Sequence, residues 1–250
     1  MIRVRCSLVS YWNWLVNMRD LKTKAIVLKR TDYGEADRIL QLLTPEGKKS
    51  VMAKGVRREK SKLAGGIELF SVSEVVIHEG KGELGILTSA KLLEHYDAFV
   101  RDIELLELGG GLMRDASKRA EQVDSPEFFN ILRQSLQAAQ KHAPEGSETR
   151  WKELLRAWAS MNMLAAAGEE INLKFDVAGE KLMPDLHYMW DVENSALAPH
   201  EMGRVSAEHI KMMRVMASTP LEVAMKVSGY GDLMDEIGYI ARCAEKATSL

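Results

Sequence analysis

At 250 residues with 46% hydrophobic content, the chain can form one or two domains with a real core, and its composition excludes extensive disorder. The formal net charge is -2, but residues 1–98 hold 17 Lys+Arg against 12 Asp+Glu, whereas residues 99–250 hold 17 against 24. This asymmetry indicates that the basic first part meets a polyanion and that the acidic second part has another role.

The cysteines and the hydropathy pattern exclude two further classes. Cys6 and Cys243 lie near opposite ends and form no CxxC or Cys/His spacing, so neither a disulfide framework nor a zinc site is predicted. No apolar run approaches the ~20 residues that a membrane helix needs. We therefore expect a protein of the reducing cytoplasm that does not contact a membrane.

Residues 1–20 are interpreted as an N-terminal extension. Their apolar run is interrupted by serine and asparagine and has no small-x-small cleavage site, so it does not conform to a signal peptide. Met18 directly precedes the first strong strand signal, and we hypothesise that translation starts there. N-terminal mass spectrometry of the native protein that found Met1 would contradict this hypothesis.

Five strands are predicted from apolar and β-branched runs separated by turn residues. Pro45-Glu46-Gly47 is a tight turn that joins the second and third strands as a hairpin. The predicted strands are residues 23–30, 37–44, 48–53, 67–78 and 84–90. Five short strands with glycine turns and a basic connection are typical of a barrel of the oligonucleotide-binding (OB) type.

Helical periodicity replaces this pattern from about residue 96. Leu105, Leu108 and Leu112 predict a first helix, which Gly109-Gly110-Gly111 weakens by about 1 kcal/mol per glycine unless a neighbour packs there. Later start signals are Ser before Pro126 and a capping box at residues 219–222. The further predicted helices are residues 126–143, 148–167, 206–218, one from residue 220 onward, and 231–247.

The resulting fold class is α+β. We predict an N-terminal five-stranded OB-fold barrel over residues 21–98, followed by a C-terminal all-helical domain over residues 99–250. Within the second domain, glycine, proline and asparagine punctuate residues 168–204, which we interpret as a loop-rich insert.

A basic stretch connects the third and fourth predicted strands. Seven of the residues from Lys48 to Lys62 are basic and only Glu59 is acidic. A strand that enters a basic, glycine-hinged loop is a common way to present cations to a phosphate backbone, although a solvated surface loop is an open alternative. Tyr33 is the nearest aromatic, so backbone contacts should outweigh base stacking. The candidate DNA-binding residues are Lys29, Arg30, Arg38, Lys48, Lys49, Lys54, Arg57, Arg58, Lys60 and Lys62.

Motifs for catalysis are missing from the sequence. It has no GxxxxGK[ST], no GxGxxG after a strand and no nucleophile elbow. Asp185, His187 and His200 could in principle share a metal, but they lie in a loop and their spacing does not match a metal-ligand pattern. No metal is therefore predicted. We expect a binding protein and not an enzyme.

Three motifs in the first part carry a family resemblance. YGEADRIL at residues 33–40, TPEGK at 44–48 and AKGVRR at 53–58 occur in the order and spacing of the DNA repair and recombination mediator RecO. The chain resembles this family firmly over about residues 23–94 and loosely through the helical part. The combination is fairly specific, whereas any one motif alone is weak.

The resemblance implies both a fold and a role. Expected are the OB barrel and the helical domain, binding of single- and double-stranded DNA, annealing of complementary strands in the RecF pathway of DNA repair, and help in loading RecA onto DNA covered by single-strand-binding protein (SSB). It also implies RecR and the acidic C-terminal tail of SSB as partners, in the bacterial cytoplasm near the nucleoid. No cofactor is implied.

The chain departs from the family in one segment. Many members carry a four-cysteine zinc site where residues 168–204 lie here, and this segment has no cysteine. Zinc is therefore not expected. The insert should instead be held by packing around Leu186, Tyr188, Met189 and Trp190.

Two other functional classes stay open. An RNA-binding OB-fold module explains the basic loop but not the helical part, and competition between matched DNA and RNA oligonucleotides separates it. A protein-binding adaptor without nucleic-acid contact explains the acidic part but not the basic loop. If DNA binding is correct, Arg57→Ala with Arg58→Ala should weaken binding and annealing and flatten the salt dependence.

Overall fold

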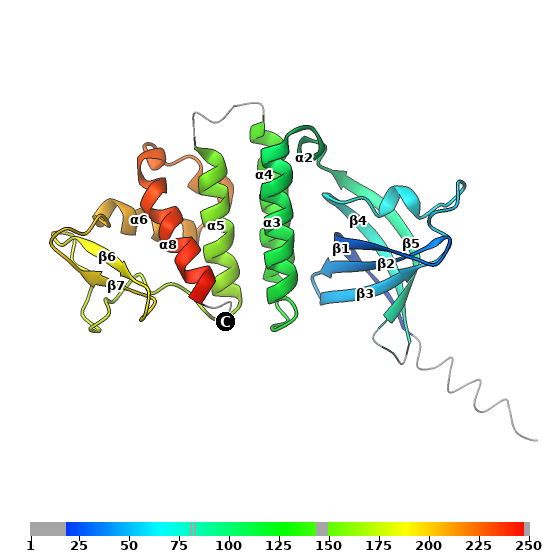
Figure 1. Ribbon diagram of the computed structural model, residues 1–250, viewed down its shortest axis with the longest axis horizontal. Coiled ribbons are helices and arrows are strands. Elements are labelled where there is room, and N and C mark those ends of the chain that lie inside the picture. The colour runs from blue at the N-terminus through cyan, green and yellow to red at the C-terminus, as the bar shows by residue number, and fades with distance from the viewer. Residues whose placement is uncertain (1–18, 81, 83, 144–149, 248–250) are drawn as a thin grey trace, which may run out of the picture. The chain divides into compact units, whose positions relative to one another are not determined.

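The computed structural model describes residues 19–80, 82, 84–143 and 150–247. It divides into two compact units, one up to His95 and one from Tyr96 onward (Figure 1). Residues 1–18 of the proposed extension, and with them the question of Met18 as the first residue, fall outside the described residues, whereas Arg19 and Asp20 belong to the first strand.

The first unit is a closed five-stranded barrel, as predicted. Its strand order is β1-β2-β3-β5-β4, and β4 pairs back with β1. Every neighbouring pair is antiparallel except β3 with β5, which run parallel. The strands are β1 (Arg19–Tyr33), β2 (Asp37–Thr44), β3 (Gly47–Ala53), β4 (Ser71–Glu79) and β5 (Leu84–His95).

One long strand closes the barrel. The first half of β1 pairs with β4 and its second half with β2, and the register shifts between Val27 and Lys29. Such a bulge bends a strand and increases its twist, which lets β1 reach both neighbours. The predicted strand, residues 23–30, was too short, because β1 continues to pair with β4 before the apolar run and with β2 after it. β5 is likewise longer than predicted, and β4 begins later than predicted, at Ser71.

Alternation along the strands fills the barrel interior. Side chains of successive strand residues point to opposite faces, so Val51 and Ala53 enter the core while Met52 between them points outward. The barrel core is Ala25, Val27, Leu40, Leu42, Val51, Ala53, Val56, Ile67, Val75, Ile77 and Leu87.

The second unit is helical. The helix α3 is capped by Asp102, whose carboxylate accepts hydrogen bonds from the backbone N–H groups of Glu104 and Leu105 at 2.8 and 3.2 Å. It runs through the three glycines, and Gly109 is buried, which is the packing that the prediction required. The elements are α2 (Ala98–Arg101), α3 (Ile103–Arg119), α4 (Glu127–His142), α5 (Trp151–Ala166), α6 (Ala207–Ser218), α7 (Leu221–Ala224), η3 (Tyr230–Leu233) and α8 (Met234–Ala247).

The helix signals had mixed outcomes. The Ser125 hydroxyl accepts from the Glu127 N–H at 3.3 Å, and Ser206 forms a capping box with His209. The predicted capping box at Thr219 is wrong, because its hydroxyl donates to the Val215 carbonyl at 2.8 Å and the helix after it, α7, is a single turn. None of the helices in the described part of the chain has both the length and the apolar character that a membrane span requires.

The insert contains a small hairpin that the sequence did not predict. Its strands are β6 (Tyr188–Asp191) and β7 (Ala196–Pro199). Tyr188 and Trp190 are buried as predicted, but the predicted packing of Leu186 and Met189 is wrong, since these side chains are 43% and 42% exposed. The strand position of Met189 explains its exposure, because it lies in β6 between two inward-pointing neighbours, whereas Leu186 precedes the strand.

Candidate nucleic-acid interface

The basic stretch forms a loop with buried anchors. We call residues 54–66, between β3 and β4, the basic loop; it ends in the 3-10 helix η1 (Ala64–Gly66). Val56 is 3% exposed and packs in the barrel core. A Cβ atom at Gly66 would lie 2.5 Å from the carbonyl oxygen of Ala90 in β5, so only glycine allows this approach without a shift. The loop is thus fixed to the barrel at both ends.

The loop is also tied to the turn between β1 and β2. The Gly55 N–H donates to the Asp37 carboxylate at 2.6 Å, and the Arg57 N–H donates to the Ala36 carbonyl at 2.9 Å. Gly55 has a φ of 64°, a left-handed conformation that favours glycine. The two segments that carry the family motifs therefore form one rim of the barrel.

Four of the ten candidate cations extend from this rim without a partner. Lys54, Arg58, Lys60 and Lys62 are exposed, and none of them forms an ion pair with another residue that the structure describes. Because their charges are not neutralised within the protein, they are available to phosphates.

Three other candidates are paired arginines. Arg30 donates to Glu68 at 2.7 Å and Arg38 donates to Asp32 at 2.8 Å. Arg57 lies 3.6 Å from the same Asp32 carboxylate. The hydrogen bond from Arg38 is the main reason why the pKa of Asp32 lies below its usual value. These paired arginines hold the rim together and offer less free charge.

The remaining three candidates lie elsewhere on the barrel. Lys29 is exposed on β1, whereas Lys48 and Lys49 begin β3 and Lys49 pairs with Glu79 at 2.9 Å. At ~3.3 Å per strand residue, Lys48 lies about 20 Å along β3 from Lys54. The ten predicted residues therefore do not form a single cluster.

An apolar row crosses the outer face of the barrel and was missed from the sequence. Register places Ile39 opposite Met52 and Met52 opposite Ile86, and all three are partly exposed. The β1 partner of Ile39 is Thr31, and Tyr33, 53% exposed, lies two residues further along β1 on the same face. Residues paired directly across strands share a face, so these side chains form one surface beside Lys54. The alternation in β3 was the signal that could have identified it.

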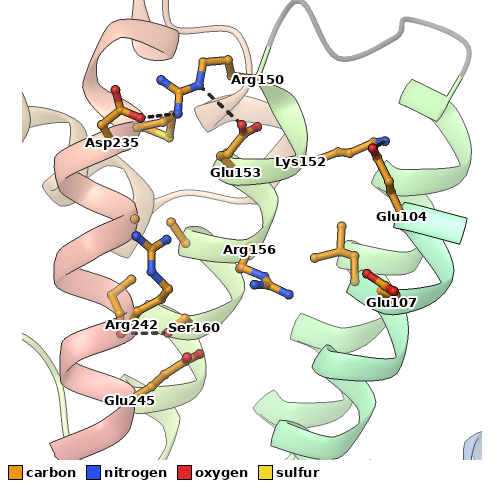
Figure 2. A pocket seen from close by; sticks show the side chains of 15 residues that line it. Glu104, Glu107, Arg150, Lys152, Glu153, Arg156, Ser160, Asp235, Arg242 and Glu245 are labelled. Atoms are coloured by element: carbon orange, nitrogen blue, oxygen red, sulfur yellow. Dashed lines mark hydrogen bonds and ion pairs between the residues drawn. The ribbon is translucent and has the colours of Figure 1, made fainter.

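The helical unit contains a second candidate site, which we call the arginine groove. It is a cavity of about 300 Å³ lined by α3, α5 and α8, with Leu108, Ala157 and Ala241 among its lining residues (Figure 2). The arginines of the groove lie against glycine-containing helices. A Cβ atom at Gly111 would lie 3.7 Å from Nη2 of Arg156, so this side chain reaches the triple glycine of α3.

Most charges around the groove are already paired. Lys152 bonds Glu104 at 2.5 Å, and this bond raises the pKa of Lys152. Arg150 binds Asp235 at 2.6 Å in the same manner. Among the described residues, Arg156, Arg242 and Glu107 form no ion pair, and Figure 2 shows Arg156 and Glu107 on facing helices. The groove thus presents two guanidinium groups outside these ion pairs beside apolar side chains, and Glu245 lies close enough to Arg156 to feel its charge.

The insert does not fit the zinc site of the resembled family. It contains no cysteine, and the described part of the chain has no group of three or more His, Cys, Asp or Glu residues that could hold a metal ion. Tyr188, Leu197 and Val205 are instead fully buried, and the Tyr188 hydroxyl accepts from the Met183 N–H at 2.8 Å. Apolar packing and hydrogen bonds hold this segment.

A closed barrel of this strand order with a cationic rim and an apolar outer row defines an OB-fold binding protein. Comparison with known proteins narrows the class. A model of the family "Recombination protein O N terminal" matches residues 18–96. The chain is 31% identical over 219 residues to the DNA repair protein RecO of Roseiflexus sp. (strain RS-1), covering 83% of this chain and 74% of that protein.

Further relatives have the same name. The RecO protein of Dehalococcoides mccartyi (strain CBDB1) is 28% identical over 227 residues, which are 87% of this chain and 86% of that protein. That of Heliobacterium modesticaldum is 44% identical over 87 residues, or 34% of this chain and 32% of that protein. The chain belongs to the RecO family of DNA repair and recombination proteins.

Proposed function

We propose that the protein binds single- and double-stranded DNA through the basic loop and anneals complementary strands. The observation that carries this proposal is the set of four exposed, unpaired cations on an anchored loop at the rim of an OB barrel. Two strands repel each other through their phosphates, and cations that neutralise phosphates lower this repulsion. Because phosphate contacts leave the base edges free, the bases can still pair.

The apolar row adds a second contact to this proposal. The row lies next to the start of the basic loop, since Met52 is two residues before Lys54, so the unstacked bases of a single strand can contact Met52 and Tyr33 while the phosphates follow the lysines. A duplex offers no free base faces and would use the loop alone. We therefore expect the protein to bind single strands more tightly than duplex. Because contacts to bases do not depend on salt, salt should account for a smaller share of the affinity for single strands than of the affinity for duplex.

A fluorescence strand-annealing assay tests the proposal. The loop variant replaces the four unpaired cations by alanine: Lys54→Ala, Arg58→Ala, Lys60→Ala and Lys62→Ala. Its matched control removes four exposed lysines elsewhere: Lys24→Ala, Lys174→Ala, Lys226→Ala and Lys246→Ala. The loop variant should anneal at least tenfold more slowly while the control, which has the same net charge, stays near the unaltered protein. Equal rates for the two variants would refute the loop as the site.

Competition between oligonucleotides addresses the RNA alternative. If an RNA oligonucleotide of matched sequence displaces DNA at equal or lower concentration, the RNA-binding module is favoured. Absence of any nucleic-acid binding at low salt would favour the protein-binding adaptor.

The partners form a second part of the proposal. Family membership supports a role with RecR and SSB in loading RecA, by binding and without catalytic turnover or a metal cofactor. We assign the acidic tail of SSB to the arginine groove, because Arg156 and Arg242 are unpaired there and apolar side chains lie beside them. Pairing within the protein neutralises most acids around the groove, but Glu107 still opposes an acidic ligand.

A labelled peptide of the SSB tail tests this assignment. Arg156→Ala and Arg242→Ala should each weaken binding several-fold, whereas Glu107→Gln should strengthen it by removing a like charge. Lys174→Ala, an exposed cation outside the groove, is the control. An unchanged affinity in both arginine variants would place the tail elsewhere.

A further inference from the structure

The insert exposes apolar side chains at high density. Among the described residues from 96 onward, thirteen large apolar side chains are exposed, and seven of them lie between residues 175 and 202, a segment that we call the insert surface. They are Phe175, Val177, Met183, Leu186, Met189, Val192 and Met202. A segment that exposes so many apolar side chains is a candidate interaction site, and methionine adapts well to a partner.

This exposure is imposed by an ordered backbone. The Arg214 guanidinium on α6 donates twice to the Leu173 carbonyl, at 3.0 and 2.7 Å, and fixes the start of the segment. The carboxylates of Asp176 and Asp191 accept backbone N–H groups in its turns. With Tyr188 filling the inner face of the hairpin, the outer side chains have no place in the core. Figure 1 shows β6 and β7 at the edge of the helical unit, beside α6.

The insert surface is also strongly acidic. It contains six Asp or Glu residues and a single Lys or Arg, Lys181. In the described part of the chain, Glu180, Asp185, Glu193 and Glu201 are exposed and form no ion pair. The insert surface therefore repels a polyanion. It is complemented by a surface that combines apolar side chains with unpaired cations.

The chain itself carries a surface of that kind. The basic loop presents four unpaired cations, and the apolar row and Tyr33 lie beside it on the barrel. We propose that the insert surface of one copy docks on the basic loop and apolar row of a second copy. The proposal rests on the proposed function in one respect: DNA and the second copy compete for the same barrel surface, so DNA binding separates the copies.

Geometry predicts how this association behaves. The contact joins two different surfaces, so each copy can bind one neighbour through its insert surface and another through its basic loop. Copies can therefore add in series. Attraction between exposed charges is screened at a Debye length of about 8 Å at physiological salt, so association should weaken as salt rises. A single-stranded oligonucleotide should return the protein to monomers.

Sedimentation velocity of the full chain at 50 mM and 500 mM salt tests the proposal through a charge swap. The insert variant is Glu180→Lys with Asp185→Lys and Glu193→Lys. The loop variant is Arg58→Glu with Lys60→Glu and Lys62→Glu. A matched control reverses three exposed acids outside the insert: Asp124→Lys, Glu127→Lys and Asp232→Lys.

The unaltered protein and the control should associate at 50 mM salt, and each variant alone should do so at least tenfold more weakly. An equal mixture of the insert and loop variants should associate again, because the reversed surfaces complement each other. A protein that stays monomeric at all concentrations, or a mixture that fails to recover, overturns the proposal. The insert variant should keep its DNA affinity; if no form binds DNA, the proposed function fails while the charge swap still tests docking.

Discussion

The basic loop and the insert surface are two irregular segments built by the same means with opposite charge. Each has buried apolar anchors, Val56 in the loop and Tyr188 in the insert. At the end of each, a glycine packs against backbone atoms: Gly66 against β5, and Gly203, directly after the insert surface, against Tyr188. Side-chain carboxylates satisfy the backbone N–H groups of the turns. The comparison teaches that a loop can carry many charges of one sign when its backbone is held by contacts that do not involve those charges.

The largest expected effects come from breaking these backbone contacts. A Cβ atom at Gly66 or at Gly203 would overlap backbone atoms, which cannot move aside as a flexible side chain would. Gly66→Ala and Gly203→Ala should each lower the free energy of unfolding by about 2 kcal/mol. Urea denaturation followed by circular dichroism measures this loss.

DNA affinity separates the two glycine variants. Gly66→Ala displaces the basic loop and should weaken DNA binding well beyond its effect on stability, whereas Gly203→Ala should leave DNA binding unchanged. Gly65→Ala, next to Gly66 but with open space around its Cβ position, is the control and should be mild in both assays. Equal DNA affinity in all three variants would mean that the loop need not be anchored to act.

An intermediate effect distinguishes free from paired cations within the loop. Arg58 has no ion-pair partner among the described residues, whereas its neighbour Arg57 lies 3.6 Å from Asp32. If Arg58 contacts one phosphate, Arg58→Ala should reduce the salt slope for single strands by about 0.7, or about fivefold in affinity at 0.1 M salt. Arg57→Ala should change the slope less. Fluorescence anisotropy across a salt series measures both, and a larger change for Arg57→Ala would reverse the assignment.

The sequence predicted the barrel well because glycine turns and alternating runs report local structure. It also located the basic loop, since charge density needs no tertiary knowledge. It could not separate free from paired cations: Arg30 meets Glu68, 38 residues away, only because the loop folds back onto β1. The apolar row was missed for a similar reason, because Met52 and Ile86 become neighbours only through the parallel pairing of β3 with β5.

The smallest expected effect concerns the paired arginines themselves. Arg38 holds the pKa of Asp32 below its usual value of 3.8 through a hydrogen bond, with Arg57 as a weaker contributor. A carboxyl group with a lowered pKa in the folded state adds stability above its unfolded pKa and loses it as the pH falls through the folded pKa. Arg38→Ala should therefore raise the pKa of Asp32 and make unfolding less sensitive to pH below about 4, although the exposure of Asp32 keeps the change small. A carboxyl NMR titration measures the shift, with Arg30→Ala as the control that leaves the Arg38 bond intact. An unchanged pKa in Arg38→Ala would show that this pair does not hold the rim in solution, and Arg38 would then join the free cations available to DNA.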